Sequence, residues 1–150
     1  MKKLIVLFLT VFTCAFLNFS FATNDSGSTV TAGKSLCVST LIVDADVTVV
    51  LVNNGKTVPE MVGNKSFSKH VALRISGDTL VISAPKSKSL QHAGVVYIPA
   101  THLRKIQINS EAHVKSLSYL RIAKLDVVVN GNCTFEVSNI GHVNLIETKG

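Results

Sequence analysis

The chain has 150 residues and a formal net charge of +6, and 47% of its residues are hydrophobic while only 6% are aromatic. This length allows one domain with a modest core but not two. Basic residues are scattered singly or in pairs without aromatic neighbours, and tryptophan is absent, so the composition argues against nucleic-acid binding.

The N-terminal segment has the three parts of a secretory signal peptide. It begins with two lysines, continues with an apolar run over residues 4–17 and ends with Ser20-Phe21-Ala22, which places small residues where signal peptidase cleaves. We therefore predict a signal peptide over residues 1–22, cleavage near Ala22, and export to the periplasm, the outer envelope or the medium. The alternative is an uncleaved anchor, but the apolar run is shorter than the roughly 20 residues that a bilayer span requires.

Residues 23–35 are small and polar, which is typical of a flexible lead-in, and we predict a single domain over residues 36–150.

After cleavage the chain would keep two of its three cysteines, Cys37 and Cys133. In an oxidising compartment these two could form a disulfide between the start and the end of the domain, or each could be a small buried apolar residue. The sequence does not fix the separation that a disulfide requires, so both interpretations stay open.

From Leu36 onward, apolar and polar residues alternate with the period of a half-buried β-strand. Many of the apolar residues are β-branched, which favours strands, and alternation is clearest over residues 47–51, 71–75, 80–84, 96–98 and 106–108. No segment of helical length keeps an apolar face at three- and four-residue spacing. We therefore predict an all-β protein.

The dipeptide Gly77-Asp78 predicts a two-residue hairpin within this pattern. Residues equidistant from such a turn lie opposite each other and share a face. Ile75 would then face Leu80, and the next pair on that face is also aliphatic, so one side of the hairpin could enter the core.

A second dipeptide of this kind, Asn54-Gly55, is a weaker hairpin candidate. Its nearest pair is apolar, but the next pair sets Val49 against Glu60, and Pro59 suits only an edge strand.

The dipeptide Asn130-Gly131 is also a common hairpin signal. A hairpin here would set apolar against polar residues in each pair, such as Val127 against Thr134. Without a hairpin, residues 125–137 keep apolar side chains at odd positions and polar ones at even positions, with one exception. Because a two-residue hairpin would break this parity, we predict a corner in a left-handed or loosely constrained conformation, with the same side of the chain kept inward.

Such a corner predicts a coil of β-structure whose turns recur along the chain. A shift of 19 residues superposes the aliphatic positions of residues 103–114 on those of residues 122–133, and a further shift of about 18 brings Leu125 onto Val143. This spacing is typical of a parallel β-helix or a similar solenoid. A β-sandwich is the alternative fold, because regularly spaced strands occur there too.

Two longer stretches resemble a known family. They are VTVVLVNNGKTVPEMVGNKSFSKHVALRISGDTLVISAP, with its polar insert and G-D-T-L-V-I return, and GVVYIPATHLRKIQINSEAHV, with its V-Y-I strand and small-residue corner. Together they resemble the head GIN domain family of auto-transporter adhesins, exported bacterial proteins found largely in cell envelopes. The resemblance covers roughly residues 36–148. It implies a short right-handed β-solenoid with an N-terminal antiparallel hairpin region, and an adhesive role, but no functional residue carries over.

Solenoids also include polysaccharide-cleaving enzymes, which need paired carboxylates on one outward face. With 19-residue rungs, Glu111 would stack on Asn130 and Asp126 on Gln107, so no acid would lie beside another. The five histidines lack the close spacing of zinc ligands and are interpreted as single surface side chains. We predict a non-enzymatic protein with no catalytic residue, metal or cofactor.

The outward face of the coil is the remaining candidate site. Its polar and charged side chains could bind a glycan or an envelope protein, or could simply be solvated: Lys105, Gln107, Asn109, Lys124, Asp126, Asn130 and Asn132. The unpaired edges at the ends of a short solenoid also predict self-association.

We therefore predict an exported, envelope-associated, non-enzymatic protein with an adhesive or structural role. The alternative is a periplasmic carbohydrate-binding or carbohydrate-processing protein, which an outward cluster of acids or aromatics would favour. Tyr97 and Tyr119 have no aromatic neighbour at rung spacing.

Overall fold

The structure is a computed structural model that describes residues 37–86 and 89–148. The predicted signal peptide and lead-in lie outside these residues. The described chain is mostly β-structure with one short helix. In chain order the elements are β1 (Thr40–Asp44), β2 (Thr48–Val52), β3 (Glu60–Gly63), α1 (Lys65–His70), β4 (Ala72–Ser76), β5 (Thr79–Ser83), β6 (Gly94–Pro99), β7 (Lys105–Ile108), β8 (His113–Ser116), β9 (Lys124–Val129), β10 (Thr134–Glu136) and β11 (His142–Glu147).

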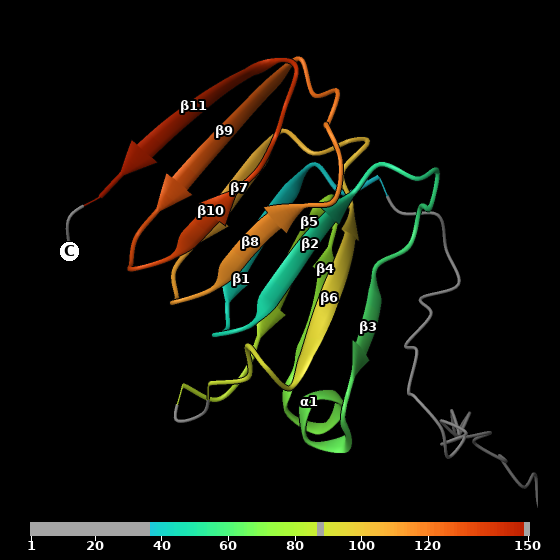
Figure 1. The fold of residues 1–150 in the computed structure, drawn as a ribbon, viewed down its shortest axis with the longest axis vertical. Helices are drawn as coiled ribbons and strands as arrows, with labels where there is room; N and C mark the ends of the chain where they lie inside the picture. The colour runs from blue at the N-terminus through green and yellow to red at the C-terminus, as the bar shows by residue number, and fades with distance from the viewer. Residues whose placement is uncertain (1–36, 87–88, 149–150) are drawn as a thin grey trace, which may run out of the picture.

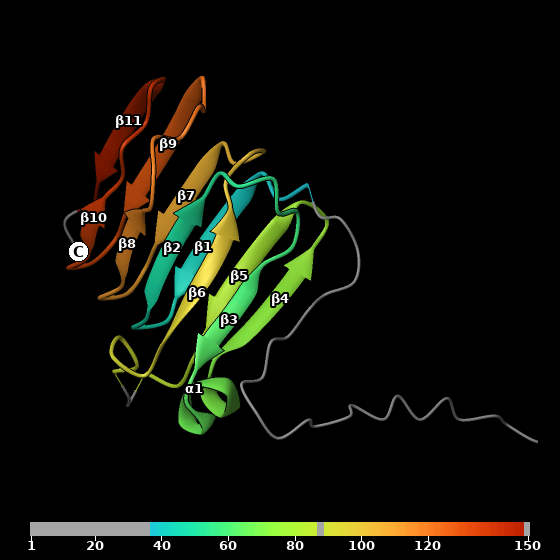
Figure 2. The same cartoon turned by 45° about the vertical axis from the view of Figure 1, so that its right-hand side comes forward.

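The strands form two sheets that lie face to face (Figures 1 and 2). Sheet A has six strands in the order β11-β9-β7-β1-β5-β4, and sheet B has five in the order β10-β8-β2-β6-β3. The chain passes from sheet A to sheet B between β1 and β2, between β5 and β6, between β7 and β8, and between β9 and β10. We call each of these consecutive pairs a rung. The rungs stack side by side, and their inward aliphatic side chains form one core between the sheets.

Parallel pairing joins the rungs, but each sheet also ends in an antiparallel strand. In sheet A, β1 pairs in parallel with β5 and β7, and β9 pairs in parallel with β7 and β11. At the other edge, β4 pairs antiparallel with β5, and β3 pairs antiparallel with β6 in sheet B. The sheets are therefore mixed. The predicted parallel coil with an N-terminal antiparallel hairpin region agrees with this only in part, because the antiparallel strands β3 and β4 lie at the edges of the two sheets, while β1 and β2 already belong to the parallel stack.

The predicted hairpin at Gly77-Asp78 is confirmed. It joins β4 to β5 with Ile75 opposite Leu80, as the pairing rule predicts. Gly77 has a φ of +62°, a conformation that glycine adopts without steric cost. The weaker candidate at Asn54-Gly55 is not a hairpin, because the strand that follows it, β3, pairs with β6 rather than with β2.

The predicted corner at Asn130-Gly131 is also confirmed. β9 ends at Val129 in sheet A, and β10 begins at Thr134 in sheet B, so the two strands do not pair. The inward side stays inward, because Val127 and Val129 before the corner and Cys133 and Phe135 after it all pack against the core. The expected left-handed backbone is wrong, since positive φ occurs only at Gly55 and Gly77 among the described residues.

The spacing of the rungs differs in part from the predicted one. β9 and β11 follow the predicted shift of 18, with Leu125 beside Val143. β7 and β9 instead pair with a shift of 21, which sets Lys105 beside Asp126. Shifts of 19 and 21 differ by two residues and so keep every side chain on its face. The aliphatic pattern therefore cannot distinguish them.

The helix α1 was not expected in an all-β protein. The Asn64 side chain caps it by accepting a hydrogen bond from the Phe67 N–H at 2.9 Å, and Phe67 is fully buried. The ring fits because Gly63 and Gly94 lie beneath it, and a Cβ at either position would lie 2.6 Å from its Cδ1. A helix of six residues is too short to give a periodic signal in the sequence. No helix in residues 37–86 and 89–148 is long and apolar enough to span a membrane.

Candidate surface-binding site

The seven residues predicted to form a binding surface lie on β7 and β9 of sheet A and in the corners after these strands. They are Lys105 and Gln107 in β7, Lys124 and Asp126 in β9, and Asn109, Asn130 and Asn132 in the corners. The structure brings most of them together across the two strands. Asn132 differs from the others because it lines a separate cavity at the C-terminal end of the molecule, with Cys133 and Phe135.

Several of these side chains bond to one another across the rungs in a row that we call the polar ladder, formed by Asp44, Asn109, Asn130 and Thr148. Asn109 Nδ2 donates to Asp44 Oδ1 at 2.5 Å, and Asn130 Nδ2 donates to Asn109 Oδ1 at 2.7 Å. The Thr148 hydroxyl donates to Asn130 Oδ1. Gln107 Nε2 adds a further hydrogen bond to Asn109 Oδ1, at 3.1 Å. The ladder thus ties β1, β7, β9 and β11 together at one end of sheet A.

A second polar row crosses the outer rungs nearer the start of the strands. Lys124 Nζ lies 3.8 Å from Asp126 Oδ1, and Asn144 Nδ2 donates to the same oxygen at 3.3 Å. The lysine and aspartate side chains are 68% and 38% exposed, so their ion pair contributes at most about 1 kcal/mol. Much of the predicted surface therefore serves to hold neighbouring strands, with its hydrogen-bonding atoms already engaged.

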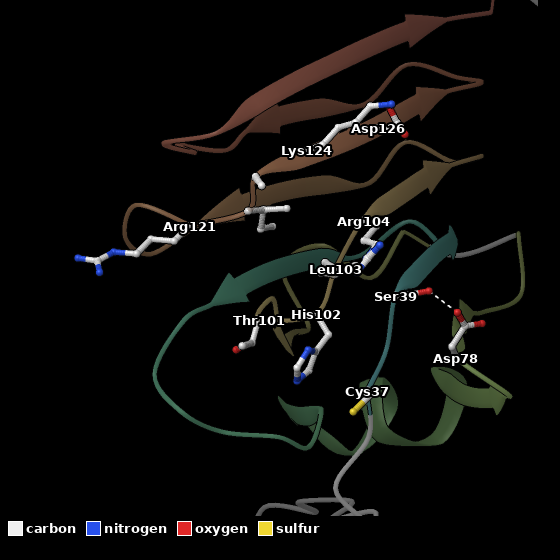
Figure 3. A pocket seen from close by; sticks show the side chains of 12 residues that line it. Cys37, Ser39, Asp78, Thr101, His102, Leu103, Arg104, Arg121, Lys124 and Asp126 are labelled. Atoms are coloured by element: carbon white, nitrogen blue, oxygen red, sulfur yellow. Dashed lines mark hydrogen bonds and ion pairs between the residues drawn. The ribbon is translucent and has the colours of Figure 1, made fainter.

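A groove of about 850 Å³ lies where the parallel strands of sheet A begin (Figure 3). We call it the strand-start groove. Ser39 lies just before β1, Asp78 just before β5 and Arg104 just before β7, while Lys124 begins β9. Residues far apart in the sequence meet here because parallel strands start at the same edge of a sheet.

Ser39 holds this edge together through its side chain and its backbone. Its hydroxyl donates to the Asp78 carboxylate, as the dashed line in Figure 3 shows, and its N–H donates to the Asp78 carbonyl at 2.9 Å. Its carbonyl accepts from the N–H groups of Arg104 and Lys105 at 2.8 and 3.0 Å. The side-chain hydrogen bond from Ser39 lowers the pKa of Asp78, because it favours the charged carboxylate.

Two arginines in the groove have no such partners. Arg104 and Arg121 are exposed, and neither side chain makes a hydrogen bond or ion pair in the part of the chain that the structure describes. Figure 3 shows their guanidinium groups well apart, with Arg104 nearer Ser39 and Arg121 extending outward on the other side. The groove therefore has two guanidinium groups that no described side chain neutralises.

A second groove, of about 530 Å³, adjoins the first and shares Thr101, Arg121 and Ile122 with it. Tyr119 lines this second groove and is 70% exposed. The sequence identified Tyr119 only as a tyrosine without an aromatic neighbour, and Arg104 only as half of a basic pair. The grooves themselves could not be predicted, because they depend on strand register and on the loops between the sheets.

The disulfide considered from the sequence is not formed in the structure, where Cys37 and Cys133 are both free thiols. Cys37 lies before the start of β1, and Cys133 lies beyond the end of β9, which runs in the same direction within sheet A. The two residues are therefore at opposite ends of the strands. Burial raises the pKa of the Cys133 thiol, and the negative charge of Glu147 adds to this effect.

The outward acids have different neighbours from those expected. Asp126 lies beside Lys105 rather than Gln107. The shift of 21 also holds between β8 and β10, so Glu111 aligns with Asn132 rather than Asn130. His113 Nε2 lies 3.4 Å from Glu136 Oε2. Within residues 37–86 and 89–148, no three His, Cys, Asp or Glu side chains are grouped so that they could hold a metal ion.

Residues 39–147 match the model of the family described as "Putative auto-transporter adhesin, head GIN domain". The chain belongs to this family. The match spans the described rungs from β1 to β11 and confirms the resemblance seen in the sequence. No curated protein matches the chain.

Solved structures show a similar fold at low sequence identity. A protein from Parabacteroides merdae described as a "putative adhesin" has 17% identity and a TM-score of 0.58, with 80% of this chain and 51% of that one aligned. A "putative adhesin" from Bacteroides fragilis has 16% identity and a TM-score of 0.53, with 81% and 62% aligned. A "putative lipid binding protein" from Parabacteroides distasonis has 9% identity and a TM-score of 0.54, with 83% and 61% aligned. The chain thus spans 51–62% of the length of these proteins.

Proposed function

We propose that this chain is an exported, non-enzymatic protein of the bacterial cell envelope that acts in adhesion. In this proposal the segment before Thr23 is removed on export, and the stacked rungs form a short right-handed β-solenoid. Membership of a family described as auto-transporter adhesins is the observation that carries the proposal. The adhesin descriptions of two structures of similar fold agree with it.

The geometry of the described residues is compatible with this role. The Ser39 hydrogen bonds fix neighbouring strands where they start, and the polar ladder fixes them at their far ends, so the loops at the strand starts leave a sheet that is braced at both ends. Between these loops lie exposed side chains that make no hydrogen bond or ion pair within the described residues, above all Arg104 and Arg121. A rigid surface with uncommitted polar groups loses little conformational entropy when it binds a partner.

Adhesion can be measured with the full chain displayed on a bacterium that does not otherwise adhere. We expect these cells to be retained under flow on surfaces coated with mucin or fibronectin, above the retention of cells that display an unrelated β-protein of similar size. Equal retention of the two strains on both coatings would contradict the proposal.

Export is tested separately, by sequencing the N-terminus of the protein recovered from the cell envelope. We expect the mature chain to begin at or near Thr23. Recovery of the chain from the cytoplasm with residue 1 intact would contradict the exported location.

A further inference from the structure

We infer that the two adjoining grooves form one binding trough for an anionic glycan, an extended sugar chain that carries carboxylate or sulfate groups. The trough is lined by Asn53, Thr101, Arg104, Ser118, Tyr119 and Arg121. The inference rests on the proposed adhesive function and names the class of ligand that this function would use.

The two grooves are continuous because they have walls in common. Thr101, Arg121 and Ile122 line both, while Arg104 lines only the strand-start groove and Tyr119 only the second one. The trough therefore runs from the starts of β7 and β9 to the loops that leave sheet B. Because the two parts, of about 850 and 530 Å³, adjoin each other, a chain of several linked sugar units could occupy both.

The charges of the trough favour an anion. Both carboxylates in the strand-start groove have partners, since Asp78 accepts from Ser39 and Asp126 pairs with Lys124. Arg104 and Arg121 have none among the described residues. A guanidinium can bind a carboxylate or sulfate through two parallel hydrogen bonds, and two such groups that stand well apart fit charges spaced along a chain.

The other lining residues are those that bind sugars. The side chains of Asn53, Thr101 and Ser118 make no hydrogen bond within the described residues, so their amide and hydroxyl groups are free to bond to sugar hydroxyls. The exposed ring of Tyr119 offers a flat apolar surface with a polar tip, on which the C–H face of a sugar can lie.

Two other classes of polymer fit the trough less well. A peptide that added a strand would need free backbone groups, but those of Ser39, Arg104 and Asp126 at this edge already bond between neighbouring strands. A single-stranded nucleic acid would stack successive bases on several aromatic side chains, and the residues that line the trough include no Phe or Trp and one Tyr, Tyr119, with His102 as the other ring. An anionic membrane surface remains as the competing ligand, and the experiment includes it.

The test measures binding of the full chain to four probes by titration calorimetry. They are a heparin-derived hexasaccharide, an oligogalacturonate of six units, neutral maltohexaose, and vesicles of phosphatidylglycerol and phosphatidylcholine. We expect saturable binding of at least one acidic sugar that weakens as salt is added, and at least tenfold weaker binding of maltohexaose and of the vesicles.

Two double variants locate the site. Arg104→Gln with Arg121→Gln should weaken binding of the acidic sugar by about tenfold or more, because two charge-assisted contacts are lost. Arg74→Gln with Lys86→Gln removes the same charge from exposed positions outside the trough and should change binding less than twofold. Tyr119→Ala should weaken the binding of the sugar while leaving its salt dependence unchanged.

Several results would overturn the inference: no binding of either acidic sugar, equal losses in the two double variants, or tighter binding of vesicles that depends on the same arginines. The display assay separates this inference from the proposed function. If cells displaying the Arg104→Gln and Arg121→Gln variant adhere as well as cells displaying the unaltered chain, the inference that the trough binds the ligand is contradicted. The proposed adhesive function is then still supported. If the unaltered chain does not adhere, the adhesive function itself fails.

Discussion

The central rungs and the last strand of the stack share the same alternating sequence pattern but differ in burial. In β1 and β7, inward side chains such as Leu41 and Ile106 are fully buried. In β11, Leu145 occupies an equivalent inward position beside Val127 and is 50% exposed. The alternation in the sequence therefore determines which way a side chain points, but not how much of it leaves the solvent.

Neighbouring strands account for the difference. β1 lies between β5 and β7, whereas β11 pairs only with β9 and forms the edge of sheet A (Figure 1). A side chain in the middle of the stack is covered by rungs on both sides, and one at the edge is covered on one side only. A residue's place in the stack should therefore determine what its substitution costs.

Truncation of an inward aliphatic residue should show the largest contrast. Ile106→Ala leaves a cavity among fully buried neighbours and should lower the free energy of unfolding by roughly 2–5 kcal/mol. Leu145→Ala removes a half-exposed side chain and should cost about 1 kcal/mol or less. Urea denaturation of both variants measures the two values, and similar losses would show that burial does not follow the position of the rung.

The two corner glycines of the last rungs give the next contrast. A Cβ at Gly141 would collide with the Ile122 carbonyl and lie 2.7 Å from that of Ala123, so Gly141→Ala should cost about 1–3 kcal/mol. A Cβ at Gly131 would meet its nearest atom, the Ser110 carbonyl oxygen, at an ordinary 3.6 Å. Gly131 also has no positive φ, so Gly131→Ala should be nearly neutral.

Thermal unfolding followed by circular dichroism measures both glycine variants. If Gly131→Ala proves as destabilising as Gly141→Ala, the corner after β9 is tighter than the structure shows.

The hydrogen bonds of the polar ladder should also matter more than those of the second polar row at the edge of sheet A. Asn109→Ala removes hydrogen bonds to Asp44, Gln107 and Asn130, and should cost roughly 0.5–1.5 kcal/mol. Asn144→Ala on the edge strand removes one hydrogen bond, of 3.3 Å, to Asp126 and should cost only a few tenths of that amount. Denaturant midpoints at equal m-values measure both losses, and equal midpoints would contradict the ladder's role.

The smallest effect concerns Cys133, in the corner before β10. Because its pKa is raised in the folded state, the thiol favours folding at pH values below its pKa in the unfolded chain. This contribution is lost as the pH rises through the folded-state pKa. Cys133→Ser should therefore flatten the loss of stability at alkaline pH. If stability falls at alkaline pH as steeply in the Cys133→Ser variant as in the unaltered chain, the raised pKa of Cys133 is contradicted.

The sequence predicted the faces of the strands and the corners but not the contacts between rungs. Parity was sufficient for Asn130-Gly131, because burial of one side constrains every residue along the strand. It could not separate a shift of 19 from one of 21, since both keep the same faces inward. That Ser39, Asp78 and Arg104 meet in one groove could not be predicted either. They lie just before β1, β5 and β7, and they come together only once the registers of these three strands are known.

The account depends most on the register of β7 against β9, which aligns the strand starts and the polar ladder. Disulfide formation between paired cysteines measures it directly, in a chain whose native cysteines are replaced by serine. Lys105→Cys with Asp126→Cys places the two thiols on adjacent residues of neighbouring strands and should cross-link readily under mild oxidation. Gln107→Cys with Asp126→Cys is the pair that a shift of 19 would favour. Faster cross-linking of that second pair would contradict the register and the groove built on it.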